Sequence, residues 1–257
     1  MGYEWNAMTT TSPAASIRDA LHPGDPVSLD EAVGLTHASR QAAVLALNHL
    51  TGRGDLALVR QRLWVRRGAT PDPYRLGARI AQPYAFVYGS ALALNGAGPA
   101  ERSEVLISSP HRFTTFEFAD VRYRWARPWI AEGIVRVPVG VEFVNATSPE
   151  RTLVDCVRVP ANAGGIEELS RAIDMLPVLN SDEVVRWVDR YHEAALAARL
   201  GYLLELSGLH GPETPLVRAL LQRRPAHRVY LAERRPGGRL VARWNVIVPP
   251  HLAVGSA

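Results

Sequence analysis

Apolar residues in the first part of the chain recur at helical spacing and predict three short helices. The first begins where Ser12 precedes Pro13, an order typical of a helix start. The second begins at Ser28, because Glu31 three residues later completes a capping box. It is expected to end near Gly34, since glycine is a common C-terminal stop.

The third helix has apolar positions that repeat every three to four residues and are expected to face a core: Ala43, Val44, Leu47 and Leu50. Thr36 or Ser39 is its expected N-cap. Two short strand patterns follow at residues 56–60 and 63–67, separated by two polar residues. Helices followed by a hairpin in this order are typical of a winged helix-turn-helix domain, in which the last helix is the recognition helix.

A second region begins after a segment rich in Gly and Pro at residues 68–73. A short helix and a helix of small residues ending at Asn95 and Gly96 come first, and strand patterns dominate residues 103–145. Helices are then expected at 148–158, 165–176, 181–191, 194–207 and 213–223, followed by strands at 227–233 and 242–249.

These patterns predict an α+β protein with an N-terminal winged helix-turn-helix followed by a larger mixed α/β C-terminal domain. We expect a flexible lead at residues 1–11, a winged-helix DNA-binding domain at 12–68 and the C-terminal domain at 74–257.

The amino-acid composition excludes several classes of protein and of catalytic site. No apolar run reaches 18 residues and no leader pattern opens the chain, so no membrane association is expected and the cytoplasm is the expected location. The single Cys156 excludes an internal disulfide framework. All 29 basic residues are arginine, which removes the lysine that a P-loop or a Schiff base requires.

Charge is concentrated in the first region. Six arginines but only one acidic residue, Asp55, lie between Ser39 and Arg67. Arginine and glutamine near the start of a recognition helix reach base edges, and arginines of a wing reach phosphates or the minor groove. The candidate DNA-binding residues are His37, Ser39, Arg40, Gln41, Arg60, Gln61, Arg62 and Arg66.

Catalytic chemistry has weaker support. Gly89-Ser90 resembles the start of a nucleotidyltransferase site, but no paired carboxylates follow about ten residues later. Glu150, Arg151 and Asp155 are either a catalytic cluster or, as we favour, a structural ion pair on a helix whose Cys156 is a small core residue. A triad of Ser90, His111 and Asp120 lacks a nucleophile elbow, and the histidines lack metal-ligand spacing. We therefore expect no catalytic residue, no metal and no cofactor.

Several ordered blocks resemble the AbiEi family of antitoxins, which are also described as transcriptional regulators of viral defence. The similarity runs from SLDEAVGLTHASRQAAVLALNHL and ALVRQRLWVRRG through PYRLGARIAQPYAFVYGSALALNG and ATSPERTLVDCV to AARLGYLLELSG. These blocks cover most of residues 27–210, and the last forty residues match less clearly. Many relatives have Arg-Gly before the aromatic strand, where this chain has Gln61-Arg62.

The resemblance implies a non-enzymatic autorepressor that binds inverted repeats of double-stranded DNA in its own promoter through the winged helix. It also implies an antitoxin whose functional partner is a nucleotidyltransferase-like toxin, in a type IV toxin–antitoxin system where direct contact is not required. Two alternatives stay open: an enzyme acting on nucleic acids or nucleotides with the winged helix as a targeting module, and a protein that neutralises a toxin by binding it.

Overall fold

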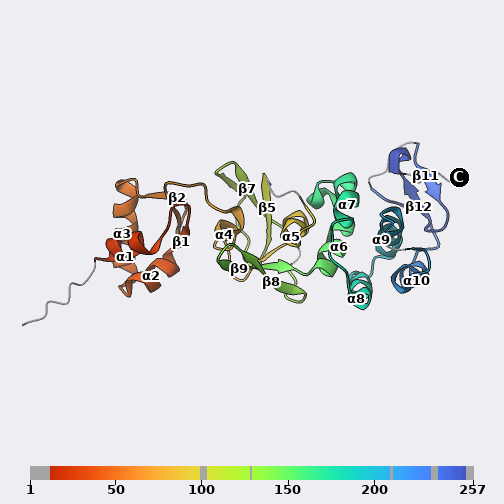
Figure 1. Cartoon of the computed structure of the whole chain (residues 1–257), viewed down its shortest axis with the longest axis horizontal. Helices are drawn as coiled ribbons and strands as arrows, with labels where there is room; N and C mark the ends of the chain where they lie inside the picture. The colour runs from red at the N-terminus through yellow and green to blue at the C-terminus, as the bar shows by residue number, and fades with distance from the viewer. Residues whose placement is uncertain (1–11, 99–102, 128, 209–210, 233–236, 253–257) are drawn as a thin grey trace, which may run out of the picture. The chain divides into compact units, whose positions relative to one another are not determined.

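The computed structural model describes residues 12–98, 103–127, 129–208, 211–232 and 237–252, so the predicted flexible lead at residues 1–11 lies outside the described residues (Figure 1). It is a mixed α and β structure made of two compact units. The first unit comprises residues 1–82 with 117–121, and the second comprises 83–116 with 122–257. Each unit is described by itself, and the predicted domain bounds 12–68 and 74–257 stay a prediction.

The first unit contains the predicted helices and hairpin in the predicted order, together with a strand, β1, that was not predicted. Its elements are α1 (Pro13–Ala20), β1 (Pro26–Ser28), α2 (Leu29–Thr36), α3 (Arg40–Gly52), β2 (Leu56–Arg60), β3 (Leu63–Arg66) and α4 (Pro73–Gly77). The strand order is β1-β3-β2, with Val27 opposite Trp64 and Leu58 also opposite Trp64. The hairpin of β2 and β3 confirms the two predicted strands.

Helix caps in this unit follow the sequence closely. The Ser12 hydroxyl accepts a hydrogen bond from the Ala15 amide at 3.3 Å, and Pro13 opens α1. In the capping box, the Ser28 amide donates to Glu31 at 2.7 Å and the Glu31 amide donates back to the Ser28 hydroxyl at 3.2 Å. Each bond satisfies an amide that the first turn of a helix leaves without an intrahelical partner.

The predicted end of the second helix at Gly34 is wrong. α2 continues to Thr36, and His37 follows in the left-handed conformation at φ 50°. The Thr36 hydroxyl donates to the carbonyl of Ala32 at 2.9 Å, which supports the last turn of the helix. Gly34 is tolerated inside the helix because a glycine interior costs only about 1 kcal/mol.

The core of the first unit is formed where α3 packs on α1 and α2 and on the hairpin. Ala43, Leu47 and Leu50 are buried and Val44 is partly buried, as their spacing predicts. Other residues of this core come from the neighbouring elements: Ile17, Val27, Leu29, Ala32, Ala46, Leu56 and Trp64. The burial of one face of α3 leaves its opposite face for solvent or a partner.

A six-stranded mixed sheet has the order β6-β7-β5-β4-β9-β8, and most of its residues belong to the second unit. The strands are β4 (Ala85–Phe86), β5 (Glu104–Ser108), β6 (Phe116–Phe118), β7 (Val121–Trp125), β8 (Ile134–Val139) and β9 (Glu142–Thr147). Within the strand patterns predicted over residues 103–145, β8 and β9 form an antiparallel hairpin, and Gly140 takes a positive φ of 59° between them.

The helices of this unit follow the sheet in sequence, except α5, which lies between β4 and β5 (Figure 1). They are α5 (Tyr88–Leu94), α6 (Pro149–Arg158), the 3₁₀ helix η1 (Pro160–Ala163), α7 (Ile166–Ile173), α8 (Ser181–Tyr191), α9 (Ala194–Leu206) and α10 (Pro215–Gln222). Their apolar faces form one core with the inner face of the sheet, and this core includes Cys156, as predicted. α9 is buried around most of its circumference, so it is the central helix of the unit.

The last part of the chain differs from the prediction. Of the expected strand at 227–233, the described residues 227–232 form only β10 (Val229–Tyr230), and residue 233 lies outside the described residues; β12 (Val246–Val248) pairs with β10 in parallel. β11 (Arg239–Val241) pairs with β12 on the other side and is followed by a turn, with the 3₁₀ helix η2 (Pro250–Leu252) at the end. Strand propensity does not indicate which other strand a segment pairs with, so the parallel pairing of β10 with β12 was not predicted.

Candidate nucleic-acid interface

The start of α3 presents polar side chains to solvent because Ser39 holds its first turn. The Ser39 hydroxyl accepts from the Ala42 amide at 3.2 Å, so Ser39 and not Thr36 is the N-cap. His37, Ser39, Arg40 and Gln41 are all exposed. A helix N-terminus also carries partial positive charge, which favours a nearby phosphate.

Asp30 brings two of the candidate arginines to one place. Its Oδ1 atom lies 2.9 Å from Nη1 of Arg40 at the start of α3 and 3.8 Å from Nη2 of Arg62 in the hairpin turn. The side chains of Arg40 and Arg62 are 51% and 54% exposed, and that of Asp30 is 75% exposed. The two guanidinium groups therefore share one solvent-facing site although 22 positions separate them in the sequence.

The hairpin turn is held in a strained conformation that presents its polar residues. Arg62 takes a positive φ of 68°, in the left-handed region that glycine adopts without strain. The register between β2 and β3 shifts between Leu58 and Arg60, which is the mark of a bulge. Gln61 and Arg62 are exposed, and burial lowers the pKa of the half-buried Arg60.

A shallow hollow adjoins this turn within the same unit. It has a volume of about 380 Å³ and is lined by the start of α2, the hairpin turn and the segment after α4, including Asp30, Arg60, Gln61, Arg62 and Arg79. Arg79 donates to both carboxylate oxygens of Glu31, at 2.9 and 3.0 Å. The capping-box glutamate is thus shared between the helix start and the segment that follows α4.

Two candidate residues have other contacts as well. Arg66 is about three-quarters buried; its Nη1 lies 3.1 Å from a carboxylate oxygen of Asp55 and donates to the Asp55 carbonyl at 3.2 Å. These contacts tie the base of the hairpin to the loop after α3. His37 closes α2 in the left-handed conformation before the turn that leads into α3. Arg66 therefore has structural contacts, and His37 has a structural position at the end of α2, in addition to their predicted contacts with DNA.

Two exposed residues on α3, Leu45 and Asn48, were not among the predicted DNA-binding residues. Leu45 is 63% exposed although it lies in the middle of the helix, and Asn48 is exposed one turn further on. Together with Gln41 they follow the i, i+4, i+7 spacing of a single helix face. These exposed positions could have been predicted from the sequence. On an amphipathic helix, the spacing of the apolar residues that face the core also shows which positions face away from it.

This face combines the chemistry needed to distinguish base pairs. Amide side chains such as Gln41 and Asn48 match the donor and acceptor pair of adenine in the major groove. An apolar side chain such as Leu45 fits the methyl group of thymine, and arginine fits guanine. Arginine, which the turn also offers, is suited to phosphate contacts, and such contacts fix position without reading sequence.

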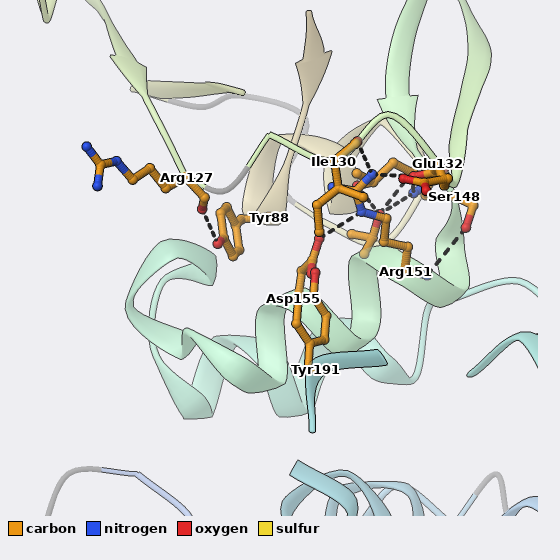
Figure 2. Close-up of polar contacts among 11 residues, drawn as sticks. Tyr88, Arg127, Ile130, Glu132, Ser148, Arg151, Asp155 and Tyr191 are labelled. Atoms are coloured by element: carbon orange, nitrogen blue, oxygen red, sulfur yellow. Dashed lines mark hydrogen bonds and ion pairs between the residues drawn. The ribbon is translucent and has the colours of Figure 1, made fainter. Parts of the chain in front are cut away.

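The possible catalytic cluster in the second unit is buried instead of open. Arg151 is 1% exposed, donates to the carbonyls of Ile130 at 2.8 Å and Glu132 at 2.5 Å, and lies over the ring of Trp187. Its Nε donates to Asp155 at 3.3 Å, and the Tyr191 hydroxyl donates to the other oxygen of that carboxylate. Figure 2 shows these side chains meeting inside the unit.

The remaining polar candidates also have structural contacts. Glu150 accepts a hydrogen bond from the Asn180 amide at 3.1 Å, which joins α6 to the start of α8. The Ser90 hydroxyl is fully buried and accepts from the Leu106 amide at 2.8 Å. In the described part of the chain, no three His, Cys, Asp or Glu residues are grouped to hold a metal ion. None of the described helices is long and apolar enough to cross a membrane.

Residues 117–206 match the family described as the AbiEi antitoxin C-terminal domain. This match confirms the resemblance inferred from the sequence, over the later part of the region where it was expected. The sequence blocks before residue 117, including the helices and hairpin of the first unit, lie outside the match.

The fold is also similar to a solved structure. The comparison is with "Crystal structure of RV2827C protein from Mycobacterium tuberculosis", at a TM-score of 0.65 and 17% sequence identity, covering 92% of this chain and 90% of that chain. At this level of identity, the likeness concerns the fold. No curated protein matches the chain.

Proposed function

We propose that this chain, an antitoxin of the AbiEi family by its domain at residues 117–206, is also a DNA-binding repressor of its own gene. In this proposal the first unit is a winged helix whose recognition helix is α3 and whose wing is the β2–β3 hairpin. Its target is an inverted repeat in double-stranded DNA upstream of the gene.

The observation that carries the proposal is the shared position of Arg40 and Arg62 around Asp30. A winged helix needs its recognition helix and its wing to meet the same duplex, one in the major groove and the other along the backbone. The contacts of Asp30 support this arrangement, since they join the start of α3 to the tip of the hairpin. The exposed Gln41, Leu45 and Asn48 continue the same helix toward base edges.

The positions of the side chains suggest which of them contact bases and which contact phosphates. We assign base recognition to Arg40, Gln41 and the overlooked Leu45 and Asn48, because they lie on α3. We assign phosphate contacts to Arg62 and the half-buried Arg60 beside it, because they lie at the hairpin turn. Ser39 and His37 shape the approach to the helix, and Gln61 lines the turn.

The test is a binding titration of the full chain with labelled duplex DNA from upstream of its gene and a scrambled duplex of equal length. Arg40→Gln is expected to reduce the preference for the upstream duplex, at a cost of about 1–3 kcal/mol for a lost bidentate contact. Arg62→Gln is expected to weaken both duplexes alike and to lower the slope of log K against log salt by about 1.

The matched control is Arg18→Gln, which removes an exposed arginine of α1 that pairs with its neighbour Asp19. It is expected to leave selectivity unchanged. The proposal fails if the wild-type chain binds the two duplexes equally, or if Arg18→Gln and Arg40→Gln have the same effect.

The antitoxin role comes with the family domain, and the toxin is the finer part of the proposal. We propose a nucleotidyltransferase-like toxin encoded beside this gene as the functional partner. Co-expression of the two genes should restore growth that the toxin alone prevents. Co-purification then distinguishes neutralisation by direct binding from antagonism without contact, because only the first yields a stable complex.

A further inference from the structure

A basic hollow in the second unit has no role in the proposed DNA contact. It has a volume of about 420 Å³ and is lined by Tyr88, Arg124, Trp125, Ala126, Arg127, Arg158, Val159 and Asn162. Three of these residues are arginines, and the described lining contains no carboxylate. Its volume lies within the range of small-molecule sites, about 300–1,000 Å³.

The arginines are held in place but retain donors. Arg124 uses Nε and Nη2 to bind the carboxylate of Glu104, at 3.0 and 3.1 Å, and Nη2 also donates to Asn162 at 2.9 Å. Arg158 donates from Nε to Glu193 at 2.7 Å and lies over the ring of Tyr191. A guanidinium has five N–H donors, so each of these arginines keeps donors for a further acceptor.

Arg127 differs from its two neighbours. Its guanidinium lies 5.3 Å from the centre of the Trp125 ring. Among the described residues, the Arg127 side chain forms no hydrogen bond or ion pair. Trp125 is itself fixed, because its indole N–H donates to the Ser109 carbonyl at 2.9 Å. The arginine therefore has a positioned charge and a complete set of donors at an exposed place.

Tyr88 helps to fix the position of Arg127. Its hydroxyl donates to the backbone carbonyl of Arg127 at 2.7 Å, and burial raises its pKa to about 12, so it remains a donor at neutral pH. Its backbone has a positive φ of 51°, which is unusual for a bulky residue and is found most often at functional sites. Figure 2 shows the Arg127 side chain extending away from the buried Arg151 and Asp155 cluster.

We propose that this hollow binds the terminal phosphate of a nucleotide, through Arg124, Arg127 and Arg158. Planar guanidinium groups pair with phosphate oxygens through paired N–H donors, which gives both affinity and orientation. The same phosphate occurs on a free nucleotide and at the 5′ end of a nucleic-acid strand, and the experiment separates these two sources. The proposal does not depend on DNA binding by the first unit.

The experiment measures binding by isothermal titration calorimetry with the full chain. The probes are ATP, GTP and a single-stranded decamer with and without a 5′-phosphate. One-to-one binding of ATP or GTP identifies a free nucleotide as the ligand. Binding of the decamer only when it is phosphorylated identifies a strand end.

Arg127→Gln is the informative variant, because Arg127 is exposed and has no ion pair with any residue that the structure describes. We expect about a tenfold loss of affinity for the phosphorylated probe, as for a lost charge-assisted hydrogen bond. Arg124→Gln should act in the same direction. The control is Arg171→Gln on α7, an arginine that is 72% exposed and pairs with Glu168.

Three results would overturn the proposal: no binding of any phosphorylated probe, equal binding of the decamer with and without its phosphate together with no binding of ATP or GTP, or equal losses in Arg171→Gln and Arg127→Gln. The duplex titration on Arg127→Gln keeps the two proposals apart. That variant is expected to bind the upstream duplex normally, whichever way the phosphate test ends.

Discussion

Replacing Asp30 with asparagine tests how charge is balanced on the proposed DNA-binding face. Asp30 lies 2.9 Å from Arg40 and 3.8 Å from Arg62, so it competes with DNA for their N–H donors. Its own negative charge also opposes an approaching phosphate. We therefore expect Asp30→Asn to bind all DNA more tightly than the wild-type chain.

The size of the effect follows from the exposure of the pairs. Exposed ion pairs contribute about 0.2–1 kcal/mol each, so two pairs contribute roughly 0.4–2 kcal/mol. That range corresponds to a gain of about twofold to thirtyfold in affinity, since about 1.4 kcal/mol is tenfold. The gain should diminish with salt, because the Debye length falls from about 10 Å at 0.1 M to about 3 Å at 1 M.

The assay is fluorescence anisotropy with the upstream and scrambled duplexes at several salt concentrations. Asp19→Asn is the control, because Asp19 is an exposed aspartate of the same unit that pairs with Arg18. A thermal melt of each variant checks the fold, since Asp30 lies in the first turn of α2 and favours that helix. The reasoning is refuted if Asp30→Asn binds no more tightly than Asp19→Asn.

Further predictions concern backbone strain, close packing and pH. Arg62→Gly should stabilise the hairpin by about 1 kcal/mol, because glycine adopts φ 68° without strain, and yet weaken DNA binding; a urea titration and the anisotropy assay measure the two effects. Gly201→Ala should destabilise the second unit by about 3 kcal/mol in urea, because a Cβ there would lie 2.1 Å from the Trp244 ring; an unchanged midpoint would contradict the close packing. Asp25→Asn should cost about 1–3 kcal/mol at pH 7, because burial alone would raise the pKa of Asp25 but its hydrogen bonds, including one of 2.7 Å from Arg75, lower it. The wild-type advantage is present above the unfolded pKa of about 3.9 and is lost as the pH falls through the lower folded pKa, so melts from pH 6 to 2 should converge.

Much of the first unit could be predicted because its signals are local. Ser12, Ser28 and Ser39 cap helices through bonds to residues three positions away, and such bonds depend only on neighbouring sequence. The same holds for the apolar spacing of α3. Gly34 misled the prediction because glycine only weakens a helix, and tertiary packing carried α2 past it to His37.

Parts of the second unit could not be predicted, for the opposite reason. β10 pairs in parallel with β12, and a strand pattern does not say which distant segment will be its partner. Trp244 packs on Gly201, more than forty positions away, and this close approach has no signature in the local sequence.

The sequence by itself determined the helix starts, the hairpin, the concentration of arginine before residue 68 and the family resemblance, because each depends on residue type and short spacing. Only the tertiary structure decided which arginines of the chain are placed to bind nucleic acid or phosphate. Arg66 forms an ion pair with Asp55 and is mostly buried, whereas Arg40 and Arg62 both contact the exposed carboxylate of Asp30. Arg127 lines a hollow and has no ionic partner among the described residues. The physical reason is that a charge acts over a few ångströms in space, and folding sets those distances independently of separation along the chain.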